Sequence, residues 1–334
     1  LGGSLIYEGK MKEEEIRPEK IFDEYLRLAK IDVEIFFKGV YSQDIPCPAC
    51  DGDGKHEFIK SGFSYSCCPN CNTLYVSPRP ENRAFERYYT KAASVEYWAT
   101  TFYRLTSDAR REKLWKPKAR MIQSVTAQYA KDATIIDIGG GYGIFAEEMK
   151  MLTGAPVTVI EPSPYLSESC RERGIPVIEK FLEDVNKNDL PKEKKVFVSF
   201  ELFEHLHDPG LFLRRVSELM RSGEVCIFTT LSGSGIDIQG LWEDSKSVSP
   251  PHHLNFFNPH SIKILLSKVG LDCLKVTTPG KLDIDILNNS CNLIKDRFLK
   301  TFIMHATDEE KAKWQEMISE TGWSSHMMVV CQKP

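Results

Sequence analysis

The residues best suited to do chemistry gather in three places along this 334-residue chain. The first place holds two Cys-x2-Cys pairs, Cys47 with Cys50 and Cys68 with Cys71. Each pair can direct two thiolates toward one tetrahedral ion, so the spacing predicts a closed, structural zinc site. Cys67 could replace Cys68, although its x3 spacing to Cys71 is less usual. Buried free cysteines are the alternative interpretation.

The second place is Thr134–Ala146, TIIDIGGGYGIFA, where a buried-type strand reaches Asp137 and a glycine turn opens a helix. Three of its four glycines, Gly139, Gly141 and Gly143, stand at alternate positions. Glycine lets the backbone turn sharply and approach a ligand, and the following helix N-terminus offers free N–H groups. A dinucleotide fingerprint would require a third glycine where Ile144 stands. The next strand, 157–160, ends at a second acid, Glu161. A glycine-rich surface turn without a ligand is the alternative.

The third place consists of two histidine-containing segments that each follow a strand. Glu204 and His205 lie in SFELFEHLHDP, and His252 and His253 lie in SPPHHLNFFNPHS. In open α/β sheets the ligand lies beyond the carboxyl ends of the strands, where both segments are expected. A histidine with a pKa near 7 suits a general base. Packing or capping roles for these side chains remain open.

These candidate residues require a sheet whose strands end at one edge. Apolar strand-like runs alternate with helical patterns from residue 131 onward, which favours an α/β fold with a mostly parallel sheet. The expected strands are 134–138, 157–160, 174–180, 196–203, 224–230, 271–276 and 326–332. Helices are expected at 162–173, 211–220 and 259–269, with His260 near the start of the last one.

Four regions are predicted along the chain. They are an N-terminal helical lead at 1–45, a zinc ribbon at 46–80, a helical lid or linker at 81–130, and the sheet-containing domain at 131–334. A segment at 280–323, with helical patterns at 284–300 and 308–320, is expected to interrupt this domain as a cap or dimer element. Within it, Asp283 and Asp285 alternate with apolar residues, either lining a cleft or forming the polar face of a strand.

The acid-x-Gly-x-Gly-x-Gly run with Glu161 resembles motif I of the class I S-adenosylmethionine (SAM) methyltransferases. The chain from about Cys47 to Pro334 is similar to bacterial members with an N-terminal zinc ribbon, of the kind associated with sugar, O-antigen or secondary-metabolite pathways. The resemblance implies a Rossmann-like sheet with an antiparallel last strand. It also implies SAM as cofactor, S-adenosylhomocysteine (SAH) as product, and a small-molecule acceptor such as a sugar or nucleotide-linked sugar.

The same resemblance suggests roles for individual residues. The cofactor would be held by Asp137, Gly139, Gly141, Gly143, Glu161, Phe181, Leu182 and Glu201. His253 is the first choice for the base that removes the acceptor proton, followed by His252, His205 and Glu204. If the acceptor is a nucleotide sugar, Arg79, Arg104 and Arg111 could bind its diphosphate.

Composition narrows the choice of partners. The formal net charge of −4 disfavours nucleic acid, since proteins that bind phosphate backbones are usually basic. No apolar run approaches bilayer length, and Leu1–Ser4 leads into charged residues rather than a secretory signal, so a cytoplasmic location is expected. An RNA or protein methyltransferase that uses the ribbon for recognition is one alternative. A non-catalytic SAM-binding protein is another, and a homodimer stands among the candidate assemblies.

Overall fold

A computed structural model describes residues 11–334, so the first ten residues of the helical lead, Leu1–Ser4 included, lie outside it. Its centre is a seven-stranded sheet in the order β12-β13-β10-β9-β6-β7-β8. The strands are β6 (Thr134–Ile138), β7 (Val157–Ile160), β8 (Val177–Ile178), β9 (Lys195–Phe200), β10 (Val225–Leu231), β12 (Asp272–Thr277) and β13 (His326–Gln332). The β6–β10 strands pair in parallel, whereas β13 runs antiparallel to both β10 and β12. The predicted antiparallel last strand is therefore confirmed.

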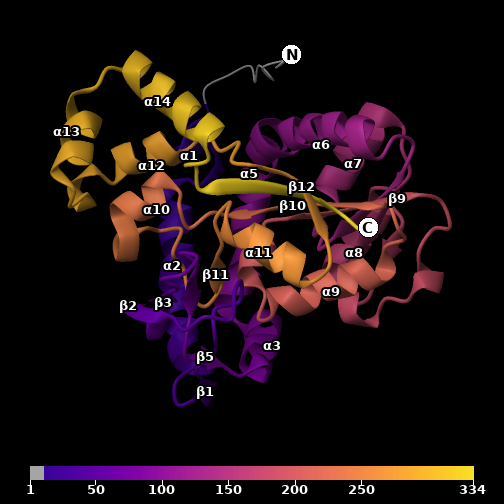
Figure 1. The fold of residues 1–334 in the computed structure, drawn as a ribbon, viewed down its shortest axis with the longest axis horizontal. Coiled ribbons are helices and arrows are strands. Elements are labelled where there is room, and N and C mark those ends of the chain that lie inside the picture. The colour runs from indigo at the N-terminus through magenta and orange to yellow at the C-terminus, as the bar shows by residue number, and fades with distance from the viewer. Residues whose placement is uncertain (1–10) are drawn as a thin grey trace.

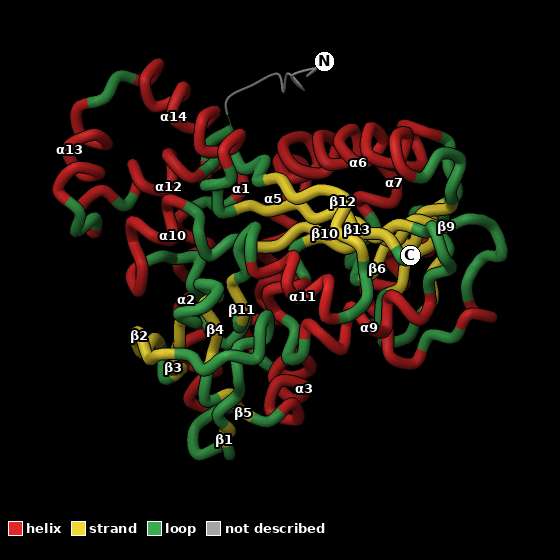
Figure 2. Tube along the Cα trace, viewed as in Figure 1, coloured by secondary structure: helices red, strands yellow, loops and turns green. Residues whose placement is uncertain are grey.

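Helices cover both faces of this sheet, as a parallel sheet requires (Figures 1 and 2). On one face α6 (Lys116–Tyr129) and α7 (Ile144–Thr153) pack against the strands, together with Cys170 of α8 (Pro164–Glu172). On the other face α9 (Pro209–Leu219) and α11 (Ser261–Lys268) pack against a second core cluster. All the carboxyl ends of β6, β7, β9 and β10 consequently open at one edge, where the candidate residues were expected.

The cysteine-containing region is a small antiparallel sheet that borrows a strand from the main domain. Its order is β11-β4-β3-β2, built from β2 (Lys55–Lys60), β3 (Phe63–Cys67), β4 (Leu74–Val76) and β11 (Asn255–Phe256). A further pair joins β1 (Ser42–Gln43) to β5 (Arg79–Pro80). Since β11 follows His253 directly, the ribbon and the histidine segment share one hydrogen-bonded sheet.

Five helices precede the main sheet and pack beside the ribbon and the open edge. They are α1 (Glu13–Ile16), α2 (Glu19–Phe36), α3 (Asn82–Lys91), α4 (Ala93–Tyr97) and α5 (Tyr103–Arg110). Short π-helical turns join α4 to α5 and α5 to α6, so the helical path predicted through about residue 129 is confirmed. Phe22, Tyr25 and Phe102 form a separate aromatic cluster between α2 and this path.

The segment between β12 and β13 is helical, as predicted, but its first helix is shorter than expected. It contains α12 (Asp283–Asn289), α13 (Arg297–His305) and α14 (Asp308–Thr321), which pack with α10 (Ile236–Leu241) around their own apolar cluster. Figure 1 shows α13 and α14 at the end of the molecule opposite α8. Asp283 and Asp285 lie on α12, so the strand interpretation was wrong. The helix buries Asp283, while Asp285 accepts a hydrogen bond from the Glu13 amide (2.7 Å).

Two further expectations need correction. His260 makes no side-chain cap; Asn258 Oδ1 instead accepts from the amides of His260 (3.0 Å) and Ser261 (2.8 Å). Arg79 is buried and makes four hydrogen bonds, to backbone carbonyls and to Asn255 Oδ1 (2.8 Å), so it is used inside the protein and does not face a diphosphate site. In both places a buried polar side chain, Asn258 or Arg79, satisfies nearby backbone groups. Among residues 11–334, no helix has both the length and the apolar composition needed to cross a bilayer.

Candidate functional site

The glycine turn begins directly after β6 and leads into α7. Gly139, Gly141 and Gly143 all have positive φ angles, +69°, +56° and +72°, which side chains other than glycine rarely adopt. At Gly140 the limit is space, because a Cβ would lie 2.8 Å from Asp137 Oδ2. The backbone can therefore follow this path only with glycine, and the amides of Gly139, Gly141 and Gly143 donate to Ile160 O, Glu161 Oε2 and Gly140 O.

Two acids flank the turn from neighbouring strands. Glu161 uses both oxygens on backbone amides, accepting from Gly141 (3.0 Å) and Ser163 (3.0 Å). Asp137 is buried, and its Oδ2 has no hydrogen-bond partner among the described residues. Burial and the neighbouring Glu161 charge raise the pKa of Asp137 to about 7. An orphaned, buried carboxylate oxygen of this kind fits a ligand that brings a donor or a positive charge.

The other residues expected around a cofactor are divided between core and surface. Leu182 is buried in the core cluster beneath α9, whereas Phe181 is 60% exposed. Glu201 follows β9 with a φ of +51°, and its Oε1 lies 3.0 Å from Lys118 Nζ and 2.8 Å from Thr229 Oγ1. Burial opposes ionisation of Glu201, but the charges of Lys118 and His326 and the hydrogen bonds from Thr229 and Lys118 together lower the pKa of that carboxyl.

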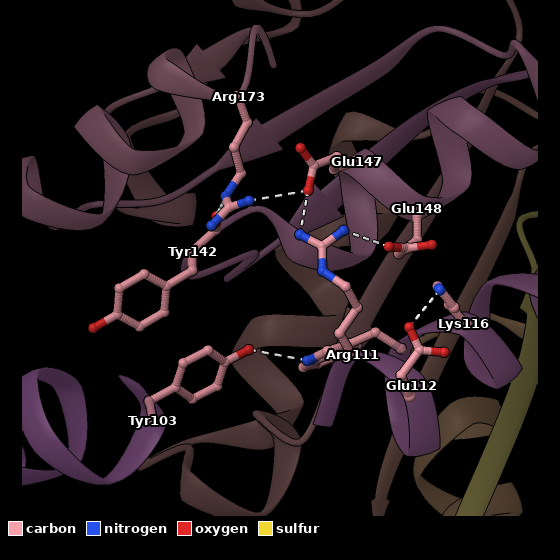
Figure 3. A network of polar contacts seen from close by, with 9 residues as sticks. Tyr103, Arg111, Glu112, Lys116, Tyr142, Glu147, Glu148 and Arg173 are labelled. Carbon is pink, nitrogen blue, oxygen red and sulfur yellow. Dashed lines mark hydrogen bonds and ion pairs between the residues drawn. The ribbon is translucent and has the colours of Figure 1, made fainter. Parts of the chain in front are cut away.

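A polar network ties the helical path to α7 over the glycine turn (Figure 3). Arg111 pairs with Glu147 and Glu148, and Arg173 reaches Glu147 at 3.0 Å. The rings of Tyr103 and Tyr142 stack with centroids 4.7 Å apart. Arg111 is thus occupied by two carboxylates, and Arg104 is exposed, so neither forms the diphosphate site that was expected of it.

The histidines predicted from two separate segments meet at one place. The ring of His205 lies 4.9 Å from that of His253 and 5.8 Å from that of His252, measured between centroids. The Leu254 amide donates to the Glu204 carbonyl oxygen (2.8 Å), which fixes the two segments together. Buried Glu204 accepts from Thr230 Oγ1 (2.9 Å), and burial with the nearby Glu201 charge raises its pKa to about 8.

Hydrogen bonds determine which histidine nitrogen is basic. His253 Nδ1 lies 2.6 Å from the Ser247 carbonyl oxygen, which can only accept, so Nδ1 carries the proton and Nε2 is the free base. His252 Nε2 instead lies 2.6 Å from the Tyr88 hydroxyl. Burial lowers the pKa of His253 to about 4 and that of His252 to about 3, and lowers the pKa of His205 as well. All three rings are neutral at pH 7.

Two groups of side chains could hold a metal ion. The Sγ atoms of Cys47, Cys50, Cys68 and Cys71 lie within 4.8 Å of one another, with 3.5 Å between Cys47 and Cys71 and 3.4 Å between Cys50 and Cys68. These separations approach the edge of about 3.8 Å expected for four thiolates bound tetrahedrally at about 2.3 Å. Glu204, His205 and His253 also bring one ligand atom each within 4.8 Å.

A cavity of about 170 Å³ lies beside the histidines, between the start of α6, the ends of β9 and β10, and α12. Trp115, Lys118, Glu201, Leu231 and His326 line it, and so does Ser247, the acceptor of the His253 hydrogen bond. Sequence reasoning missed Lys118 and His326, because each comes from a region without a motif.

Comparison with known proteins identifies the family to which the sheet-containing part of the chain belongs. Residues 103–276 match the family described as "Methyltransferase domain". The ubiquinone biosynthesis O-methyltransferase of Azorhizobium caulinodans is 29% identical over 106 residues, which cover 30% of this chain and 42% of that protein. The mitochondrial enzyme of the same name from Schizosaccharomyces pombe is 33% identical over 104 residues, covering 29% and 38%. The chain thus spans about 40% of the length of these relatives.

Solved structures with a similar chain path include the plantazolicin methyltransferase BpumL in complex with SAH. It is 12% identical to this chain, with a TM-score of 0.49, and the match covers 75% of this chain and 95% of that one.

Proposed function

The chain belongs to the methyltransferase-domain family, and from this premise we propose that it transfers a methyl group from SAM to a small-molecule acceptor, with His253 as general base. The observation that carries the proposal is the free Nε2 of His253. It lies at the edge of the sheet that the glycine turn and its two acids also occupy, and its partner Ser247 lines the cavity. The base thus adjoins the space for an acceptor through Ser247, and the cofactor turn lies at the same edge of the sheet.

The residues around the glycine turn fit SAM. Asp137 has an unpartnered buried oxygen, and Glu161 keeps lone pairs beyond the two amides that it already accepts. Both carboxylates suit a ligand that carries an ammonium, a sulfonium and ribose hydroxyls. We propose that Asp137, Glu161 and the glycine backbone hold the amino-acid and ribose parts, with Phe181 and Leu182 beside the adenine and Glu201 at the reacting end.

The four cysteines fit a structural zinc ion. Besides the sulfur separations, a Cβ at Gly52 would lie 3.4 Å from Cys50 Sγ and 3.6 Å from Cys68 Sγ, so glycine keeps the approach to the sulfurs open. Four thiolates leave no open position for a substrate or water, which is why the proposed role is structural. The ion would fix the ribbon, and through β11 the histidine segment.

When bound, SAM would supply an electrophilic methyl group whose leaving group is a neutral thioether. His253 Nε2 would accept the proton that the acceptor loses, so that the acceptor keeps the electron pair with which it bonds the methyl carbon. The Ser247 carbonyl holds the tautomer and stabilises the imidazolium that forms. His205 and Glu204 position His253, and holding the acceptor and the base in a fixed orientation would provide much of the rate.

The size of the cavity supports a compact acceptor. A cavity of about 150 Å³ accommodates benzene, so about 170 Å³ accommodates one six-membered ring with small substituents. A pyranose ring, free or as the end of a nucleotide-linked sugar, fits this size, and we propose a sugar or a sugar-like ring as the acceptor. An RNA or protein methyltransferase is the competing function, and filter binding with tRNA and rRNA separates the two.

The decisive experiment compares His253→Gln with wild type for SAH release in the presence of a pyranoside and phenol panel. We expect wild-type protein to bind SAH in calorimetry. We expect His253→Gln to keep that affinity while kcat falls roughly 100- to 10,000-fold, the usual loss when a general base is removed.

His56→Gln serves as the matched control, since His56 is an exposed histidine of the ribbon that bonds Ser64 and lies outside the cluster. Absence of SAH binding in wild type would rule out the methyltransferase proposal. An unchanged kcat in His253→Gln would show that His253 is not the general base and would leave the methyl-transfer proposal intact. A kcat that depends on added divalent cation and is abolished by chelation, with the cysteine-bound zinc retained, would assign Glu204, His205 and His253 to a metal instead.

A further inference from the structure

The cavity beside the histidines carries an excess of positive charge. Among the described residues that line it, five are cationic and two are acidic: Arg17, Arg110, Lys113, Lys118 and Lys281, against Glu201 and Asp283. Two of the cations are paired, Lys118 with Glu201 at 3.0 Å and Lys113 with Glu15 at 3.3 Å. The Asp283 carboxylate accepts from Ser324 Oγ (2.7 Å) and the Ser325 amide (2.6 Å), so it is already satisfied.

Arg110 is a cation of this cavity with a buried hydrogen-bond donor that has no acceptor among the described residues. Its buried Nε has no hydrogen-bond partner, its Nη1 donates to the Ile16 carbonyl oxygen at 3.4 Å, and the Tyr103 hydroxyl is a further partner of the guanidinium. Its guanidinium lies over the rings of Tyr103 and Trp98, at 5.4 and 5.8 Å. No carboxylate of the described residues lies within ion-pair distance of Arg110. Its neighbour Arg111, by contrast, holds two carboxylates.

A buried guanidinium N–H without an acceptor is costly, since the unmet donor loses its hydration. Burial lowers the pKa of Arg110, and the charge of Arg17 lowers it further, while Tyr103 and Glu201 act in the opposite direction. The charge of Arg17 also lowers the pKa values of His253 and His326, so Arg17 lies near these two histidines. The planar guanidinium groups of Arg110 and Arg17 carry several N–H donors each, and such groups bind the oxygen atoms of a carboxylate or phosphate.

We propose that Arg110 and Arg17 bind a carboxylate or phosphate group of the methyl acceptor, so that the acceptor is an anionic ring compound. The inference rests on the proposed methyl transfer and adds the acceptor's charge to it. The other source of an oxyanion at this edge is the carboxylate of the cofactor's amino-acid part. The acceptor is favoured because the cavity is lined from β9, β10, β13 and α12, and by no residue of the glycine turn and not by Glu161.

The test uses the full-length, zinc-loaded protein saturated with SAH and three ring probes of cavity size. Cyclohexanecarboxylate and cyclohexyl phosphate carry the oxyanion, and cyclohexanecarboxamide is the neutral match. Calorimetry should show the better anionic probe binding wild type at least tenfold more tightly than the amide. Arg110→Gln should abolish that preference, and Arg110→Lys should retain part of it. Arg104→Gln, an exposed position on the same helix, should change nothing.

Each outcome decides the inference separately from the proposed function. If wild type does not bind SAH, the proposed function fails before the probes are used. If SAH binds but neither anion exceeds the amide, the anionic acceptor is excluded and the methyltransferase proposal stands. If Arg110→Gln weakens SAH tenfold or more and leaves probe binding unchanged, Arg110 holds the cofactor's carboxylate and the inference is wrong. Unfolding midpoints of both Arg110 variants show whether a loss reflects misfolding.

Discussion

The two halves of the open edge are built in different ways. On the β6–β7 side, Asp137, the glycine turn and Glu161 lie within 25 consecutive residues. On the β9–β10 side, the proposed base His253, its neighbour His205 and Arg110 come from three separate segments. The first side is determined by local geometry, whereas the second depends on how distant segments pack. We therefore expect them to respond differently to substitution.

The position of the histidine segment on the β9–β10 side (the histidine side) depends on contacts with the ribbon. Tyr65 of β3 donates its hydroxyl to the His253 carbonyl oxygen (2.7 Å). Asn258 Nδ2 donates to the Cys71 carbonyl oxygen (2.7 Å), and β11 pairs with β4. No comparable contact joins the ribbon to the glycine turn among the described interactions. Loss of the ribbon should consequently damage one half of the edge and spare the other.

The largest expected effect comes from breaking the metal site. In Cys68→Ala we expect zinc, measured by atomic emission, to fall from one ion per chain to none. Methyl transfer should fall more than 100-fold, because a structural zinc site contributes about 10 kcal/mol or more to folding of its module. The SAH dissociation constant should stay within about threefold of wild type, since the sheet has its own core.

Cys67→Ala is the control, because this neighbouring thiol is absent from the four-cysteine group. It should retain zinc and activity. If Cys68→Ala lost SAH affinity to the same extent as methyl transfer, the two halves of the edge would depend on the ribbon equally, and the distinction between them would be wrong. Zinc loss in Cys67→Ala but not in Cys68→Ala would replace one proposed ligand with the other.

A smaller effect, confined to the other half, is expected for Glu161→Gln. The amide keeps one acceptor oxygen but loses the negative charge, and charged hydrogen bonds contribute about 1.5–3 kcal/mol. The SAH dissociation constant should therefore rise roughly 10- to 100-fold in calorimetry. Binding of the anionic ring probes should be unaffected once SAH is at saturation. Glu172→Gln, an exposed site on α8, is the control, and an unchanged SAH affinity in Glu161→Gln would remove this residue from the cofactor site.

The same division explains what could be predicted from the sequence. The glycine turn and the strands around it were predictable because glycine conformations and strand patterns are local. The role of Arg110 was not, since adjacent Arg111 carries the same charge and only packing decides which one meets Glu147 and Glu148. Asp283 and Asp285 show a related limit: alternation over a few residues fits a strand and one helical turn equally well.

The smallest expected effect concerns how the histidine side responds to acid. His252 is 8% exposed, and burial lowers its pKa to about 3, against about 6.5 in the unfolded chain. Between these values the unfolded state binds the proton and the folded state does not, so stability is fully present above pH 6.5 and falls as the pH drops. At pH 5 the loss from this one residue is about 2 kcal/mol.

His252→Gln tests this directly, because glutamine can still accept from the Tyr88 hydroxyl but does not titrate. Urea unfolding at pH 7 and pH 5 should show a smaller acid loss in His252→Gln than in wild type, by about 2 kcal/mol. The raised pKa values of Asp137 and Glu204 act in the opposite direction in both proteins, so the difference between the two proteins isolates the histidine. His56→Gln should follow wild type. Equal acid losses in wild type and His252→Gln would mean that His252 is solvated, and that the histidine side is more open than its burial indicates.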